Sequence, residues 1–368
     1  MNRVIVLSLW AVACGDPCEE SGTICTVMGN GVAGVAAEGA KADESSLYWP
    51  ADVTLDPQGT PYVVDWNNHR LLALPQDDEG ALTVHRITGN SMIGDGPWNA
   101  PASTAFWNHP TNIAFDTDGT FVFAGWHNSR VLRVDPVADY VTLEGGNGSR
   151  SFVGDGGLAV DAGFDLPSSV AFAEDGTLYV SDQANQRIRA IDTDGFIQTV
   201  VGTGDEAFAG DGGPAIDACL HSETSQNAEP AGRIVISGST MYIADTSNQR
   251  IRTVDMDSWI IDTFVGGGTG IPVEGEGLLE TSILNPRDVA VAPNGDVYFA
   301  DSDHGCIRVV RGDSVETVAG VCGELGYDGD GGPASEAILN RPYGIDMAPD
   351  GALWIADTYN HAIRRVTP

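Results

Sequence analysis

The chain is a succession of short segments in which apolar and polar positions alternate. In one stretch an apolar run at 234–236 is followed by a second run at 241–245, then by arginine-bearing residues at 250–252 and an outer run at 262–266. Alternation with a period of two over four to eight residues is typical of half-buried β-strands. No segment keeps the 3.6-residue period of an amphipathic helix for long, so the pattern predicts an all-β protein.

This unit of four short strands recurs along almost the whole chain. The residue that ends its second strand recurs at intervals of 56 to 63 residues, and it is Asp65, Gly125, Asp182, Asp245, Asp301 and Asp357. One such unit cannot bury both of its faces, so units of this kind stack radially as the blades of a propeller. Six copies predict a six-bladed β-propeller over residues 23–368.

The two chain ends predict how the ring closes. The last unit offers only three strands, at 344–348, 352–357 and 362–366, whereas residues 23–29 match the outer strand at 316–320 without a unit of their own. We therefore expect residues 23–28 to complete the sixth blade beside 362–366. Closure of this kind removes two strand edges that would otherwise invite aggregation.

The turns after the second strands carry a family resemblance. The strings DWNNHRL at 65–71 and DTYNH at 357–361 resemble the NHL repeat, and the resemblance covers roughly residues 23 to 368. It implies a propeller of NHL-type blades. Because many NHL propellers serve as interaction modules, it also implies a binding scaffold.

The repeated polar residues have a structural interpretation first. Aspartate at the end of a strand can cap the following turn, and asparagine tolerates the left-handed conformation of such turns. The acidic glycine-rich loops, such as 154–157 and 210–213, also recur from unit to unit, so we interpret them as structural turns and not as metal sites. The recurring arginines can reach neighbouring carboxylates with a forked guanidinium, and they are Arg70, Arg130, Arg187 and Arg250.

Charge excludes one class of partner. The formal net charge is −34, and Lys41 is the only lysine beside 17 arginines. A surface so negative repels phosphate backbones, so a nucleic acid is excluded as partner. Solubility in a saline exterior and attraction of cationic ligands both remain open as reasons for the charge.

The first residues predict export. Arg3 precedes an apolar run at 4–10, and small residues at 11–13 precede Cys14. This arrangement resembles a bacterial lipobox, although Ala11 stands where leucine is usual. We expect a signal peptide at 1–13, lipidation of Cys14, a short tether at 14–22 and a place in the cell envelope, at the outer membrane or in the periplasm. A simple secretory signal is the alternative, and the lipid anchor would be the only contact with a membrane.

Tryptophans concentrate in the first two units. In the expected topology, the loops that precede the innermost strands and the turns that follow the second strands lie on one face. Five tryptophans map there: Trp49, Trp66, Trp98, Trp107 and Trp126. An exposed aromatic cluster indicates a binding surface, here for an extracellular protein, peptide or carbohydrate. Packing between blades is the alternative.

The start of each innermost strand supplies a candidate cation site. Asp52, Asn112 and Asp288 occupy a position where family copies commonly have glycine, as at Gly344, while Arg233 occupies it in the fourth unit. Three oxygen-bearing side chains at the channel mouth could hold calcium, which takes oxygen ligands. Capping of the strand starts is the alternative, and no other cofactor is expected.

Catalysis has little support in the sequence. Four of the seven histidines lie within or beside the NHL string, and the sequence contains neither a compact zinc-ligand spacing nor a G-x-S-x-G nucleophile string. We therefore favour a non-enzymatic binding scaffold. The competing hypothesis is a metal-dependent lyase or lactonase-like hydrolase with a divalent cation near Asp52, Asn112 and Asp288.

Two further features remain. An exterior location favours disulfides, and Cys18 with Cys25 and Cys306 with Cys322 are the plausible pairs, which leaves Cys219 free and buried.

The fourth unit carries extra residues at 221–229, where a loop insertion could determine specificity or could reflect neutral drift.

Overall fold

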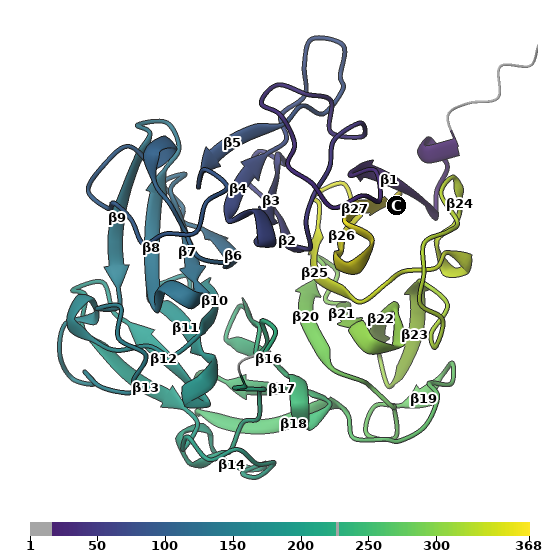
Figure 1. Ribbon diagram of the computed structural model, residues 1–368. Coiled ribbons are helices and arrows are strands. Elements are labelled where there is room, and N and C mark those ends of the chain that lie inside the picture. The colour runs from purple at the N-terminus through teal and green to yellow at the C-terminus, as the bar shows by residue number, and fades with distance from the viewer. Residues whose placement is uncertain (1–16, 226–227) are drawn as a thin grey trace, which may run out of the picture.

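The computed structural model describes residues 17–225 and 228–368, and these form six antiparallel sheets arranged around a central axis (Figure 1). The predicted six-bladed propeller is confirmed. Blades 1 to 3 have four strands each: β2 (Pro50–Leu55), β3 (Pro61–Asp65), β4 (Arg70–Ala73) and β5 (His85–Thr88); β6 (Pro110–Phe115), β7 (Phe121–Gly125), β8 (Arg130–Asp135) and β9 (Tyr140–Gly145); β10 (Pro167–Phe172), β11 (Leu178–Asp182), β12 (Arg187–Ile191) and β13 (Ile197–Val201).

Blades 4 to 6 each add a two-residue strand at their outer edge, which the sequence pattern did not predict. Their strands are β15 (Ile234–Ser237), β16 (Thr240–Asp245), β17 (Arg250–Asp255), β18 (Ile260–Gly266) and β14 (Gly213–Pro214); β20 (Pro286–Val291), β21 (Val297–Asp301), β22 (Cys306–Arg311), β23 (Ser314–Ala319) and β19 (Glu276–Gly277); β25 (Pro342–Met347), β26 (Leu353–Asp357), β27 (Ala362–Val366), β1 (Thr23–Met28) and β24 (Gly332–Pro333).

The helices of the described residues are all single 3₁₀ turns. One set follows the second strands: η2 (Trp66–Asn68), η4 (Trp126–Asn128), η6 (Gln183–Asn185), η8 (Thr246–Asn248), η9 (Ser302–His304) and η11 (Thr358–Asn360). The others are η1 (Pro17–Glu19), η3 (Ala102–Thr104), η5 (Ala159–Asp161), η7 (Ala215–Asp217) and η10 (Ala334–Glu336). None of these helices is long and apolar enough to cross a membrane.

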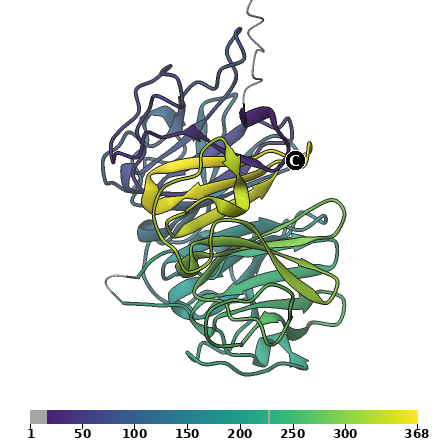
Figure 2. The ribbon, with the colours of Figure 1, turned by 90° about the vertical axis from the view of Figure 1, so that its right-hand side faces the viewer.

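The ring closes as the chain ends predict. β1 pairs antiparallel with β27, with Ile24 opposite Val366 and Cys25 opposite Arg365. Figure 2 shows the purple N-terminal strand lying along the yellow strands of blade 6. Pairing of this kind joins the two ends of the described chain within one sheet, so neither end of the ring is left as an open strand edge.

The core lies between neighbouring blades. The second strands β3, β7, β11, β21 and β26 are buried along their whole length, because each is covered on both faces by the adjoining blades. Between blades 1 and 2 the contact is aromatic: the Tyr62 and Phe121 ring centroids are 5.7 Å apart. Burial on both faces explains why these strands are mainly apolar up to the residue that ends each of them.

The residue that ends each second strand organises the following turn. In blade 1, Asp65 Oδ1 accepts the backbone N–H of Tyr48 at 2.8 Å, and its Oδ2 accepts hydrogen bonds from Asn68 and Arg70. The left-handed residue is the one after the asparagine, such as His69 with φ of 57°, and not the asparagine itself. The aspartate therefore caps the turn as predicted, while the residue that adopts the unusual backbone angle differs.

Blade 2 replaces this aspartate by Gly125 and compensates within the same turn. The side-chain Oδ1 of Asn128 accepts the backbone N–H of Asn108 at 2.8 Å, as the aspartate does in the other blades. Arg130 then pairs with Asp95 at 3.0 Å in the preceding loop.

The expectation for the arginines is correct for Arg70 and Arg130 and wrong for two others. Arg187 and Arg250 donate to backbone carbonyls of Asn185 and Asn248. In blades 3, 4 and 6 the arginine that binds a carboxylate lies two residues further along the third strand, where a glycine-rich acidic loop faces it. The pairs are Arg189 with Asp155 at 2.7 Å, Arg252 with Asp211 at 2.6 Å and Arg364 with Asp330 at 2.7 Å.

Both expected disulfides are present. Cys18 and Cys25 are joined with a Cα separation of 5.8 Å, and Cys306 and Cys322 with one of 5.1 Å. Cys219 is the free cysteine of the described residues, and it is half-buried where we expected full burial. The predicted signal peptide and Cys14 lie outside the described residues.

Strand pairing defines two faces of the ring. The start of β2 lies beside the end of β3, since Pro50 pairs with Asp65. We call the face that carries these ends the mouth face. The hairpin turn at 56–60 and the connection at 74–84 lie on the other face, since Leu55 pairs with Pro61 and Ala73 with His85.

Candidate functional site

A row of aromatic side chains crosses the mouth face from blade 6 to blade 2. Tyr359 stacks on Trp49 with ring centroids 5.1 Å apart and an interplanar angle of 27°, and Trp49 stacks on Trp66 at 6.1 Å and 23°. Trp66 meets Trp126 at 5.8 Å, and Trp126 stacks on His127 at 4.2 Å. We call these five residues the aromatic arc. Such stacked and tilted ring pairs are favourable geometries for aromatic side chains.

The turns of the fold place the arc residues. Trp66 and Trp126 each begin the 3₁₀ turn after a second strand, and Tyr359 lies in the matching turn of blade 6. Trp49 precedes β2 in the left-handed conformation, with φ of 52° and its backbone N–H bonded to His361 Nδ1 at 3.1 Å. The arc therefore combines one loop residue with three turn residues of the repeat, and His127 follows Trp126 in the same turn.

The residues of the arc differ in their exposure to solvent. His127 is exposed and Trp49 and Tyr359 are partly exposed, whereas Trp66 and Trp126 are buried beneath them. A ligand on this face would contact the first three. The two buried tryptophans hold the arc in place.

Two of the five candidate tryptophans lie outside the arc. Trp107 is fully buried, donates its indole N–H to Thr88 Oγ1 at 2.8 Å and packs against Phe123 at 5.1 Å. It therefore belongs to the core and offers no surface for a ligand, because its side chain points between blades. Trp98 packs under the guanidinium of Arg130, 4.2 Å from its ring centroid, in the loop before blade 2.

Three histidines gather at the blade 2 end of the arc. The ring of His109 lies 4.3 Å from that of His69 and 4.9 Å from that of His127, and its Nε2 is 3.0 Å from Asn67 Oδ1. Burial, with added repulsion from the two other histidines, lowers the pKa of His109 to about 3. His127 keeps an exposed edge, but partial loss of hydration where its ring packs on Trp126 and His109, together with the charge of Arg150, lowers its pKa to about 4. Both rings are therefore neutral at pH 7. Among the described residues, no group of His, Cys, Asp and Glu side chains could hold a metal ion.

The channel mouth contains a polar layer centred on Arg233. Its guanidinium donates to both carboxylate oxygens of Asp52, at 3.0 and 2.7 Å, and lies 3.3 Å from Asp288. Asn112 Nδ2 donates to Asp52 at 2.9 Å. The structure thus brings together the three residues of the candidate calcium site, with the protein's own cation among them.

The same residues also cap the neighbouring blades. Asp52 accepts the backbone N–H of Ile113, Asn112 that of Val170, and Asp288 that of Ile345, at 3.2, 2.8 and 2.9 Å. Each side chain thereby fixes the innermost strand of the next blade. Gly344 completes the pattern in blade 6, because an added Cβ would lie 2.5 Å from Asp52 Oδ1.

Burial perturbs the acids of this layer. Burial raises the pKa of Asp288 to about 7 in spite of Arg233, and it raises the pKa of Asp346 to about 6. Arg233 keeps its charge, because the surrounding carboxylates outweigh its burial and raise its pKa. The layer is therefore a compact ionic plug across the channel.

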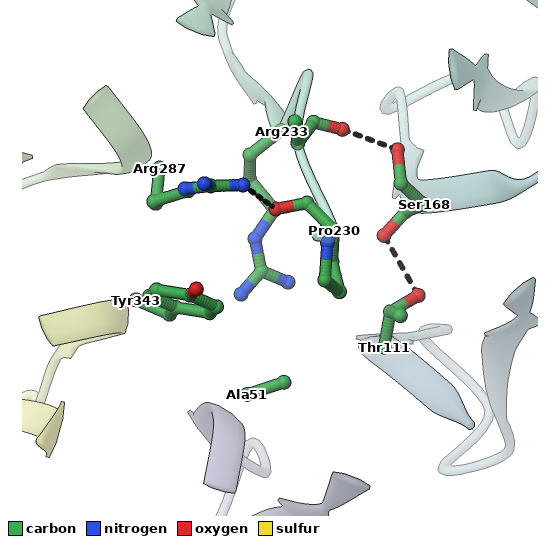
Figure 3. A pocket seen from close by; sticks show the side chains of 8 residues that line it. Ala51, Thr111, Ser168, Pro230, Arg233, Arg287 and Tyr343 are labelled. Atoms are coloured by element: carbon green, nitrogen blue, oxygen red, sulfur yellow. Dashed lines mark hydrogen bonds between the residues drawn. The ribbon is translucent and has the colours of Figure 1, made fainter. Parts of the chain in front are cut away.

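Pro230 and Ala231, which follow the insertion of blade 4, lie in a small pocket next to Arg233 (Figure 3). Arg287 donates to the carbonyl of Pro230 at 2.6 Å, and Ser168 donates to that of Ala231. The space left between these residues is about 10 Å³, which is about the volume that admits one water molecule. Below the plug, the innermost strands line a cavity of about 290 Å³.

Glu229 of the insertion connects the plug to the arc. It pairs with Arg287 at 2.7 Å, accepts a hydrogen bond from the hydroxyl of Tyr359, and lies 3.7 Å from Arg341. Burial would raise the pKa of Glu229, but these partners, Arg287 foremost, hold it below its usual value. We did not expect any of these four side chains to act at the mouth. The unusual length of the insertion pointed to Glu229 alone, since the other three lie in blades 5 and 6.

Models of two repeat families match parts of the chain. The NHL repeat matches residues 339–365, and the teneurin NHL domain matches residues 144–192. Together with the six-bladed ring, these matches support an NHL-repeat propeller.

Curated relatives share the repeat region. Teneurin-m of Drosophila melanogaster is 34% identical over 52% of this chain, and teneurin-1 of Gallus gallus is 25% identical over 94%. Protein SUPPRESSOR OF QUENCHING 1, chloroplastic, of Arabidopsis thaliana is 26% identical over 87%. The chain spans only 8%, 13% and 31% of the length of these relatives, respectively.

Solved structures share the fold. A protein of unknown function and an auxiliary nutrient binding protein, both from Bacteroides thetaiotaomicron, match 93% of this chain with TM-scores of 0.67 and 0.64, and cover 74% and 75% of their own chains. Both are 17% identical to it. A streptogramin B lyase matches 88% of this chain and 94% of its own, with a TM-score of 0.51 and 11% identity. At these identities the likeness shows the fold alone.

Proposed function

We propose that this chain is an exported, lipid-anchored NHL-repeat propeller that acts as a binding scaffold and engages an extracellular or periplasmic protein, peptide or carbohydrate at the aromatic arc. The single observation that carries the proposal is the continuous row of rings from Tyr359 through Trp49 to Trp126. Partly exposed aromatic side chains supply large contact areas with little loss of conformational entropy on binding.

The closed channel favours binding over catalysis. Arg233, Asp52 and Asp288 fill the channel mouth with mutually paired charges, and Pro230 borders a small pocket next to Arg233. A ligand would therefore rest on the mouth face and not enter the channel from it. The fold shared with auxiliary nutrient binding proteins of Bacteroides is consistent with a role in capturing a ligand.

The geometry also suits an anchor at Cys14. Cys18 and Glu19 border a groove that is also lined by the turns at 58–61 and 348–350, which lie opposite the mouth face. A lipid attached four residues before Cys18 would leave the aromatic arc directed away from the membrane. Growth of the expression host with a labelled fatty acid tests this: the parent is expected to carry the label and Cys14→Ser to lose it, whereas an unlabelled parent would refute the anchor.

The alternative is a metal-dependent lyase or lactonase-like hydrolase with a divalent cation at Asp52, Asn112 and Asp288. It has less support, because both oxygens of Asp52 already bind the guanidinium of Arg233. A cation at this place would have to displace a buried, charged side chain.

Arrays of immobilised oligosaccharides and of peptides, probed with the purified chain, test the proposed binding face. We expect retention on one class of array, loss of that retention in Trp49→Ala, and no loss in Trp98→Ala, which removes a tryptophan outside the arc. Equal retention by parent and Trp49→Ala, with both folded, would overturn the assignment of the arc.

A further inference from the structure

A groove lies between blades 3 and 4, on the side of the ring opposite the mouth face. It measures about 270 Å³, close to the lower end of the range of about 300 to 1,000 Å³ typical of small-molecule sites. Its lining includes Thr177 and Asp192, from two turns of blade 3, and Trp259, from the turn between β17 and β18. These turns are at the strand ends away from the mouth, so the groove is separate from the aromatic arc and does not depend on the proposed function.

Strand pairing accounts for the hollow in blade 3. Tyr179 of β11 pairs with Ala190 of β12, and Ala190 pairs with Gln198 of β13. The three side chains therefore form a row across one face of the blade, and this face packs against blade 4. In the matching row of blade 2 the central residue is Arg133, whose guanidinium reaches over the ring of Phe172 in blade 3. The small side chain of Ala190 leaves the corresponding space open.

Trp259 contributes the wall on the side of blade 4. Its ring centroid is 6.4 Å from that of Tyr179, and its side chain is partly exposed. Its backbone is left-handed, with φ of 56°, a conformation that aspartate and asparagine tolerate far better than a bulky residue. In the equivalent turn of blade 2 this place belongs to Asp139, with φ of 50°. The turn thus disfavours tryptophan, while the ring offers an aromatic surface to the groove.

The rest of the lining mixes aromatic and hydrogen-bonding side chains. Phe196 is 48% exposed, the Gln198 amide is exposed and the Thr177 hydroxyl group belongs to a partly exposed side chain. Among the described residues, neither Gln198 nor Thr177 has a hydrogen-bond partner for its side chain. The groove therefore offers two aromatic surfaces together with free amide and hydroxyl groups.

The charge of the groove disfavours an ionic ligand. Of the described residues that line it, Asp192 alone is charged, and its Oδ1 already accepts the backbone N–H groups of Asp194 and Phe196. An anion would find no cationic group there and would meet the net charge of −34. A wholly apolar molecule would cover the amide of Gln198 without giving it a hydrogen-bond partner, which is unfavourable. The lining suits a neutral molecule that has both an apolar face and hydroxyl groups.

We propose that this groove binds one ring of a neutral saccharide. A pyranose has an apolar face of C–H groups and a rim of hydroxyl groups. The C–H face lies on the exposed part of Trp259, with Phe196 at its edge, and the hydroxyl groups bond to Gln198 and Thr177. The volume of the groove admits a single sugar ring, so the ligand is a monosaccharide or one terminal unit of a longer chain.

Saturation-transfer NMR with the methyl β-pyranosides of glucose, galactose, mannose and N-acetylglucosamine tests the proposal. We expect transfer from the chain to the ring C–H protons of at least one glycoside. Trp259→Asn removes the aromatic ring and suits the left-handed backbone, so this variant should stay folded and lose the transfer. The matched control Trp98→Phe alters a tryptophan of another blade and should keep it.

Two further variants locate the bound sugar. Gln198→Ala changes an exposed side chain, so it leaves the core intact and should weaken binding about fivefold, as expected for one neutral hydrogen bond. Trp49→Ala should bind the glycoside as the parent does, which separates the groove from the aromatic arc. Transfer to none of the four glycosides, or equal affinity in the parent, Trp259→Asn and Gln198→Ala, would overturn the proposal. Transfer that Trp49→Ala loses and Trp259→Asn keeps would also overturn it, and would place the sugar on the arc.

Discussion

Arg233 and Asp52 lie 181 residues apart in the chain and form a two-pronged ion pair in the middle of the propeller. The pair connects blade 4 to blade 1 across the channel, and both side chains are buried. The ring is therefore held by contacts between neighbouring blades and also by a charged contact across its axis. This contact also occupies the place where a divalent cation would otherwise find three oxygen-bearing side chains.

Removal of this arginine should destabilise the protein strongly. Arg233→Met leaves Asp52 and Asp288 buried without their cation, and breaking a buried pair in this way costs about 3–5 kcal/mol. Urea denaturation measures the loss. Arg311→Met, which removes a half-exposed arginine paired with Asp296 and Glu316, should change the free energy of unfolding by less than about 1 kcal/mol. Equal effects of the two substitutions would refute the role given to Arg233.

The packing role of Trp107 predicts a large effect on stability and little on binding. Trp107→Ala leaves a cavity beside Phe123 and removes the hydrogen bond that Thr88 accepts from the indole, while Thr88 still donates to Ala102, so the free energy of unfolding should fall by about 3–5 kcal/mol. Thermal and urea denaturation check the value. A variant as stable as the parent would show that this side chain is not a core residue.

The histidines beside the arc predict a specific pH dependence. The pKa of His109 is about 3 in the folded chain and about 6.5 when unfolded, so the unfolded state binds one more proton between these values. The stability that this histidine contributes is present above pH 6.5 and is lost as the pH falls towards 3, by about 1.4 kcal/mol per pH unit.

Comparison with His109→Gln isolates that contribution, because buried acids such as Asp288, whose pKa is raised to about 7, titrate in both proteins. Denaturation midpoints between pH 7 and pH 4 should fall more steeply in the parent than in the variant. Parallel pH profiles would contradict the depressed pKa of His109.

The disulfide of blade 5 should stabilise the ring. Cys306 and Cys322 enclose a short loop, so the double substitution Cys306→Ala and Cys322→Ala should lower the free energy of unfolding by about 3 kcal/mol. Cys219→Ala, which removes the free thiol of the described residues, is the matched control and should change it little. Equal stability of the double variant and the control would refute this contribution.

Much of the fold could be predicted because the information is local and repeated. Alternation within strands such as β16 and the regular return of residues like Asp182 and Asp357 are visible in the sequence, and six copies reinforce one another. Closure by β1 followed from counting, since the last unit lacks a strand that the N-terminus supplies.

The chemistry of the mouth could not be predicted in the same way. The position of Arg233 in the repeat was clear from the sequence. Its partner was not, because that depends on the width of the channel, which no local sequence pattern encodes. Arg187 and Arg189 lie on the same side of one strand, and only the approach of the loop with Asp155 decides which of them binds a carboxylate. For the same reason Trp49 and Trp107 precede innermost strands in neighbouring blades, yet only Trp107 is fully buried.

The most direct test of the binding face is calorimetric titration of the purified parent and of Trp49→Ala with one oligosaccharide or peptide that the array retains, together with their melting temperatures. The account predicts that Trp49→Ala weakens binding at least about tenfold, a loss of about 1.4 kcal/mol, and leaves the melting temperature near that of the parent, because the Trp49 side chain is partly exposed. An unchanged dissociation constant with a lower melting temperature would contradict it and would assign Trp49 to the packing between blades.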